Sequence, residues 1–95
     1  ASLLEFNIEQ NNISSVTLFP NPTDHRTELQ ATINKDTRLE TSIFNLLGEK
    51  MFCAVKNVKK GTMQQVINIE HLTAGSYILQ LKTNNELINK SIIRK

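Results

Sequence analysis

The chain has 95 residues, enough for one domain with one modest hydrophobic core. Charged residues make up 21% of the sequence and hydrophobic residues 39%, the balance of an ordinary globular domain. The formal net charge is +2, aromatic residues are 5% and tryptophan is absent, which argues against nucleic acid as a partner. The apolar runs are far shorter than the ~20 residues of a membrane-spanning helix.

Residues 1–15 are expected to be a linker or leading strand from an upstream domain. Leu4, Phe6 and Ile8 alternate with polar residues, as in a half-buried strand. The chain begins without an initiator methionine, which suggests that it was excised from a longer protein. A first strand is predicted at about 16–20, because Pro20 and Pro22 cannot donate to a β-ladder.

Further strands are predicted at roughly ten-residue spacing, at about 27–33, 38–46, 50–56, 64–70, 76–83 and 86–93. Gly48 and Gly61 supply turn positions that favour positive φ, and Asn84-Asn85 suits a type I′ hairpin turn. No segment keeps a long helical stripe, so at most one helical turn is expected, near residues 70–73.

Seven short, evenly spaced strands predict an all-β fold, an immunoglobulin-like antiparallel β-sandwich. Tyr77, at the start of a late strand, is expected to hydrogen-bond back across a corner, as in that fold. The last strand carries apolar residues on both faces, so something could cover its outer side. The predicted inward-facing residues are Leu18, Leu29, Ala31, Ile33, Leu39, Ile43, Ile67, Ile69, Leu72, Tyr77, Leu79 and Leu81.

The sequence offers little for catalysis or for metal and cofactor binding. Cys53 lies in an apolar run and is expected to be a buried small hydrophobe. His25 and His71 lack cysteine partners at zinc spacing, and no nucleophile elbow or glycine-rich phosphate loop is present. We therefore expect no catalytic residue, no metal, no cofactor and no small-molecule substrate.

Four segments, in this order, carry a family resemblance. They are Val16 to Thr23 with its Pro-Asn-Pro box, Ile43 to Met51 around Gly48, Leu72 to Tyr77, and the basic terminal strand Lys90 to Lys95. Over residues 16–95 the chain resembles the type A C-terminal sorting domain of the type IX secretion system of Bacteroidetes, also called the Por secretion system sorting domain. Cys53 is not part of the family's pattern.

The resemblance implies a non-catalytic sorting signal at the C-terminus of a larger cargo protein. Such a domain is recognised in folded form by the outer-membrane translocon, after a signal peptide has carried the cargo to the periplasm. A sortase-like peptidase commonly removes the domain after export, and the cargo is attached to the cell surface. The expected locations are thus the periplasm in transit, then the outer membrane, the cell surface or the medium.

The resemblance also divides the motif residues into two sets. A terminal strand at a sheet edge offers unpaired backbone groups to a partner or to a second copy of the chain, and its cations would steer it to an acidic partner. Translocon recognition is therefore expected at Lys90, Ser91, Ile92, Ile93, Arg94 and Lys95. The residues expected to be structural are Pro20, Asn21, Pro22, Gly48, Gly75 and Tyr77.

Two alternatives remain open at this level. A domain that is retained could serve as a periplasmic or surface protein–protein interaction or signalling module. An adhesion or carbohydrate-binding module could share the sandwich, but the absence of tryptophan and the structural role expected of Tyr77 count against sugar binding.

Overall fold

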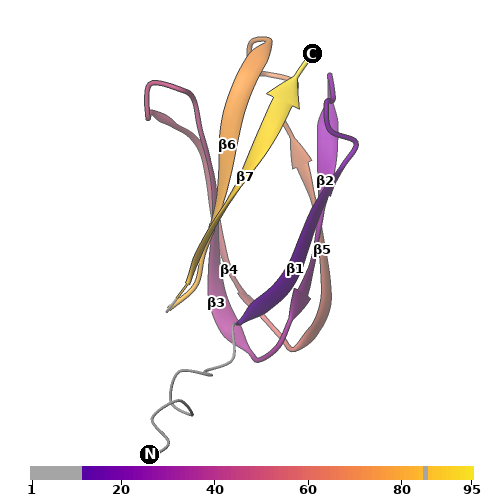
Figure 1. Ribbon diagram of the computed structural model, residues 1–95, viewed down its shortest axis with the longest axis vertical. Coiled ribbons are helices and arrows are strands. Elements are labelled where there is room, and N and C mark those ends of the chain that lie inside the picture. Colours follow the sequence, from indigo (N-terminus) through magenta and orange to yellow (C-terminus); the bar gives the residue numbers. More distant parts are fainter. Residues whose placement is uncertain (1–11, 85) are drawn as a thin grey trace, which may run out of the picture.

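The structure, a computed structural model, describes residues 12–84 and 86–95. Within these residues it contains seven strands and no helix, which confirms the all-β prediction (Figure 1). The described part of the chain has no helix that could cross a membrane. The strands are β1 (Ile13–Phe19), β2 (Arg26–Ile33), β3 (Thr37–Phe44), β4 (Lys50–Val58), β5 (Gly61–Asn68), β6 (Gly75–Lys82) and β7 (Leu87–Arg94).

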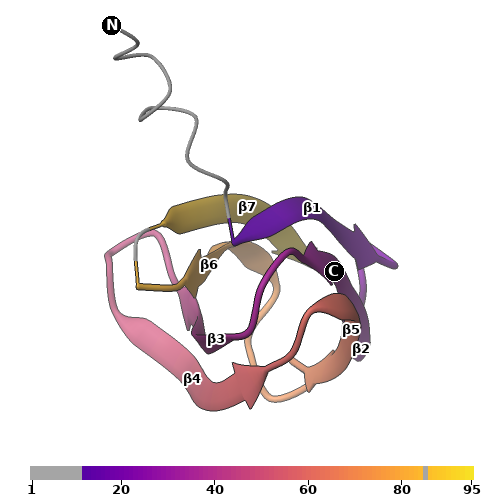
Figure 2. The ribbon, with the colours of Figure 1, turned by 90° about the horizontal axis from the view of Figure 1, so that it is seen from below.

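The strands form two antiparallel sheets that face each other, in the order β1-β2-β5 and β4-β3-β6-β7 (Figure 2). All the strand pairs within the sheets are antiparallel. The sandwich is immunoglobulin-like, with β4 joined to β3 in the larger sheet. The edge strands β1 and β7 belong to different sheets and lie side by side along one side of the sandwich (Figure 2).

The core lies between the sheets and follows the period-two alternation of the strands. In β2, for example, Leu29, Ala31 and Ile33 are buried, whereas Gln30 and Thr32 between them are exposed. The predicted inward-facing residues are all buried except Leu18, which is half-buried and packs against the core. The sequence prediction missed four core residues, Ile13, Val58, Met63 and Ile92.

The predicted strands agree with the observed ones to within a few residues at their ends. β1 begins at Ile13, three residues earlier than predicted, because Ile13 is itself buried in the core. It ends at Phe19, before two prolines that both follow cis peptide bonds. The predicted hairpin turn at Asn84-Asn85 includes residue 85, which lies outside the described residues.

The prediction that Cys53 is buried is wrong. Cys53 is exposed on β4, an edge strand of the larger sheet. Its neighbours Phe52 and Ala54 are half-buried and take the inward positions, so the alternation turns Cys53 outward. The run from Met51 to Val55 is apolar on both faces, so the sequence pattern could not fix which face is buried.

Candidate functional site

All four motif segments of the sequence meet at one end of the sandwich. Successive antiparallel strands reverse direction, so β1, β3, β5 and β7 finish at the end where the C-terminus lies (Figure 1). We call this end the motif end. It comprises the β1–β2 loop (residues 20–25), the β3–β4 turn (45–49), the β5–β6 loop (69–74) and the last residues of the chain (91–95).

The Pro-Asn-Pro box holds the end of β7. The Asn21 side chain donates from Nδ2 to the Ser91 carbonyl (2.9 Å) and accepts at Oδ1 from the Ile93 amide (3.0 Å). The Thr23 amide donates to the Ile93 carbonyl (3.0 Å), and the Lys95 amide donates to the Thr23 carbonyl (2.8 Å). Since Pro20 and Pro22 have no N–H group, the Asn21 side chain and the Thr23 backbone supply the strand-like contacts.

These contacts overturn one part of the sequence prediction. The edge of β7 was expected to be unpaired, but the Ser91 carbonyl, both backbone groups of Ile93 and the Lys95 amide are occupied. A partner strand cannot pair with these groups unless the β1–β2 loop moves away. The prediction missed this because the bonds join residues 70 and 72 positions apart.

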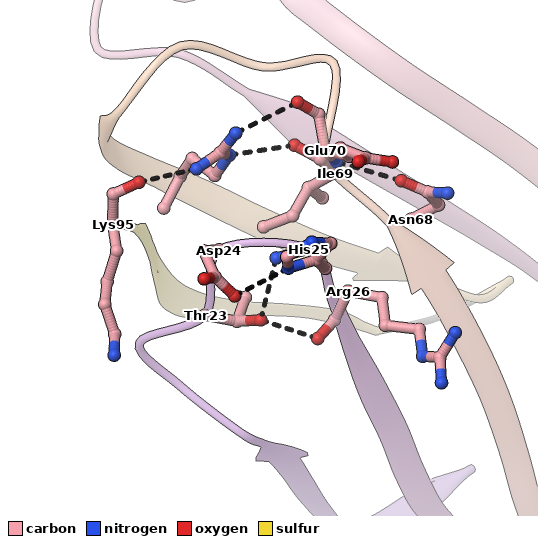
Figure 3. Close-up of polar contacts among 9 residues, drawn as sticks. Thr23, Asp24, His25, Arg26, Asn68, Ile69, Glu70 and Lys95 are labelled. Carbon is pink, nitrogen blue, oxygen red and sulfur yellow. Dashed lines mark hydrogen bonds and ion pairs between the residues drawn. The ribbon is translucent and has the colours of Figure 1, made fainter.

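Thr23 and Thr27 shape the β1–β2 loop from inside. Thr23 is buried; its Oγ1 donates to the Arg26 carbonyl (2.7 Å) and accepts from the His25 amide (3.3 Å) (Figure 3). The buried Thr27 hydroxyl donates to the Pro20 carbonyl (2.9 Å). Side-chain bonds therefore fix both the start and the end of the loop.

Asp24 and His25 form an exposed pair on the same loop. Asp24 Oδ1 and His25 Nδ1 lie 2.8 Å apart (Figure 3). The hydrogen bond to His25 and, after it, the positive charge of a protonated ring lower the pKa of the Asp24 carboxyl. Within the described residues, no group of three or more His, Cys, Asp or Glu could hold a metal ion.

Arg94 joins the end of β7 to the β5–β6 loop. Its guanidinium donates from Nε to the Ile69 carbonyl (3.3 Å) and from Nη2 to the Glu70 carbonyl (3.0 Å) (Figure 3). A third bond, from Nη1, reaches the Lys95 carbonyl. Each of the three guanidinium nitrogens of the half-buried Arg94 therefore donates a hydrogen bond within the fold.

Tyr77 confirms the predicted corner. Its side chain is buried, and its hydroxyl donates to the Thr73 carbonyl (2.6 Å) at the end of the β5–β6 loop. Gly75, two residues before Tyr77, has a φ of 150°, a conformation that L side chains rarely adopt. This is the tyrosine corner expected in an immunoglobulin-like sandwich.

The β3–β4 turn is built around Asn45, which the sequence analysis did not single out. Asn45 Oδ1 accepts from the amides of Leu47 and Glu49, both at 2.9 Å, and Nδ2 donates to the Glu49 carboxylate at 2.6 Å. Gly48 has the predicted positive φ, at 86°. An asparagine three residues before a glycine, between two strands, is the sequence signal that could have revealed this turn.

A family model described as a secretion system C-terminal sorting domain matches residues 17–95. The chain belongs to this family. No curated protein matches the chain. Membership implies a C-terminal sorting signal for type IX secretion, and thus export across the outer membrane toward the cell surface or the medium. Sorting domains of this family are in general non-catalytic.

In this sorting domain, the residues from Lys90 to Lys95 differ in burial and in contacts. Ile92 is fully buried in the core and Arg94 is bound to loop carbonyls, whereas Ser91, Ile93 and Lys95 are exposed at the motif end. Lys90 is exposed away from the motif end, where it lines a groove between β1 and β7 together with Ile13, Ser14, Ser15, Val16 and Ile88.

Proposed function

We propose that this domain is a non-catalytic sorting signal that the type IX machinery recognises in its folded form, exporting a cargo joined to its N-terminal side. The observation that carries the proposal is the meeting of the four motif segments at one end of the sandwich. Asn21 contacts Ser91 across 70 positions of the sequence, so this surface exists only when the chain is folded.

The position of the N-terminal side supports the same proposal. The Asn12 and Ile13 amides donate to Glu86 Oε1 at the end opposite the motif end. A cargo would therefore leave the domain from that opposite end, and the motif end would stay accessible to the translocon. In this proposal a sortase-like peptidase removes the domain after export, and the cargo is then attached at the cell surface.

In β7 and the residue that follows it, we assign recognition to the exposed residues at the motif end, Ser91, Ile93 and Lys95. Lys95 adds positive charge that would steer the domain toward an acidic partner. Ile92 serves the core, so deleting residues 90–95 would remove a buried side chain along with the signal. A clean test must therefore change exposed side chains and leave the strand in place.

The experiment fuses residues 1–95 behind a signal peptide and a reporter in a bacterium with an active type IX system. The test variant is Ile93→Glu with Lys95→Glu. The matched control is Lys82→Glu with Leu87→Glu, two exposed residues that pair across β6 and β7 at the far end. We expect the wild type and the control to be exported, and the test variant to stay in the periplasm although its melting curve shows that it is folded.

Two outcomes would count against the proposal. A wild-type fusion that folds in the periplasm but is not exported would refute the sorting function. Equal export of the test variant would move recognition away from the last strand. The size of the reporter on an immunoblot separates a removed domain from a retained interaction module, because a retained domain stays joined to the exported reporter.

A further inference from the structure

The β3–β4 turn presents two leucines to solvent. Leu46 is 72% exposed and Leu47 is 86% exposed. Figure 1 shows that this turn stands apart from the β1–β2 loop at the motif end. Single exposed apolar residues are common on protein surfaces, but two adjacent leucines exposed at the tip of one turn form an apolar patch that a partner could cover.

The turn holds the two leucines in place. The Leu47 amide donates to Asn45 Oδ1, and the Gly48 amide donates to the Asn45 carbonyl at 3.0 Å. The Asn45 amide donates to the Glu49 carbonyl, also at 3.0 Å, and closes the hairpin. A segment that is already ordered loses less conformational entropy on binding, so an anchor built in this way binds more tightly than a flexible one.

We infer that Leu46 and Leu47 form an apolar anchor that inserts into a hydrophobic pocket on a protein of the export machinery. The inference rests on the proposed sorting function and names the side chains that a partner buries. A pocket that removes these two apolar side chains from water gains free energy roughly in proportion to the apolar area that it covers. Their place at the motif end lets the same partner contact the exposed residues of the last strand.

The charges near the turn favour a protein over a lipid surface. Loops and helices that enter membrane interfaces typically combine apolar residues with Lys, Arg or Trp. The turn from Asn45 to Glu49 has none of these, and it carries the negative charge of Glu49. The adjacent Lys50 is engaged elsewhere, with its ammonium 3.5 Å from the Glu40 carboxylate and 5.8 Å from the centre of the Phe44 ring.

The first test places Leu46→Ser with Leu47→Ser in the reporter fusion. The matched control is Leu87→Ser, which changes a leucine that is 53% exposed at the opposite end. We expect the double variant to reduce export at least tenfold and to accumulate folded in the periplasm, while the control is exported like the wild type. If the wild type is exported and the double variant is exported equally well, the anchor is overturned and the sorting function stands. Failure of the wild type would instead overturn the sorting function.

The second test asks what the anchor touches. A photo-crosslinking amino acid at position 47 should link the fusion to a protein of the type IX outer-membrane apparatus, and the same group at position 87 should not. Purified chain 1–95 is also sedimented with vesicles of phosphatidylethanolamine and phosphatidylglycerol. If the wild-type chain binds these vesicles and the variant Leu46→Ser with Leu47→Ser does not, the two leucines anchor the domain to a membrane. That result would overturn the proposal of a protein partner.

Discussion

The two long sides of the sandwich differ in how their edge strands are protected. On the β1/β7 side, Asn21 and Thr23 hold the end of β7 at the motif end, and Glu86 holds the start of β1 at the other end. On the β4/β5 side, the described residues show no backbone hydrogen bond that joins the two edges between the sheets. The side that carries the terminal strand is thus the closed one, and the exposed Met51, Cys53 and Val55 lie on the open one.

An edge strand such as β7 is therefore not always free to pair with another chain. Unprotected strand edges invite pairing with other chains, and proteins often cover them with loops. Here the covering loop contains the Pro-Asn-Pro box, and its contacts join the box and the end of the terminal strand into one unit. A dimer through the terminal strand remains a prediction, and it would have to use the part of β7 before Ser91.

The largest expected effect comes from the core residue on the closed side. Ile92→Ala should lower the free energy of unfolding by about 2–5 kcal/mol, because Ile92 is fully buried and its loss leaves a cavity. Urea denaturation measures the change. Ile93→Ala is the control: that side chain is 41% exposed, and the loss should be about 1 kcal/mol or less. Similar losses for the two variants would show that the strand is not oriented as described.

A smaller loss of stability is expected when the contacts between Asn21 and β7 are removed. Asn21→Ala removes two hydrogen bonds to β7, each of which contributes about 0.5–1.5 kcal/mol, so we expect a loss of about 1–3 kcal/mol. Amide hydrogen exchange gives the sharper readout. The Ile93 amide loses its acceptor and should exchange faster, whereas the Thr23 amide keeps its bond to the Ile93 carbonyl. Unchanged exchange at Ile93 would contradict the role of Asn21.

On the open side, the thiol of Cys53 should be accessible to reagents, and its replacement should leave stability almost unchanged. Cys53 is exposed, so Cys53→Ser should change the free energy of unfolding by no more than about 0.5 kcal/mol. In the native protein, Cys53 should react with a thiol reagent without prior unfolding. A cysteine placed at the buried position of Ala31, in the Cys53→Ser background, should react only as fast as the protein opens. Slow labelling of native Cys53 would show that the open side is covered.

The smallest effect concerns the exposed pair on the β1–β2 loop. His25 lowers the pKa of Asp24, so the pair adds stability above the unfolded pKa of Asp24 and loses it as the pH falls through the lowered folded value. An NMR titration of the Asp24 carboxyl should show the depression, and His25→Ala should move the pKa back toward the ordinary aspartate value. If the Asp24 titration is the same with and without His25, the pair does not form in solution.

The sequence predicted the architecture well because local patterns carried it. Strand positions followed from period-two alternation and from turn residues such as Gly48 and Pro20, and Tyr77 marked the corner. The wrong predictions concern features that no local sequence pattern specifies. Cys53 lies in a run that is apolar on both faces, so its orientation depends on pairing with β3.

The site was predicted in part, for a similar reason. The motif residues were found in the sequence, but their meeting at one end depends on strand direction, and the hold on β7 depends on contacts 70 and 72 positions apart. Arg94 looked like a free cation because nothing near it in sequence shows that the Ile69 and Glu70 carbonyls lie within its reach. Its recognition role and that of its neighbours stay predictions.

The placement of Asn12 at the end opposite the last residues also determines how the domain would bear force. A machine that grips the motif end while load acts on the chain before Asn12 would pull along the axis of β1. The β1–β2 hydrogen bonds run perpendicular to that axis, so they would be sheared together and not broken one after another. The Glu86 contacts with Asn12 and Ile13 would meet the load first. Under such a load the domain would act as a folded handle, because β1 separates from β2 only when these bonds break together.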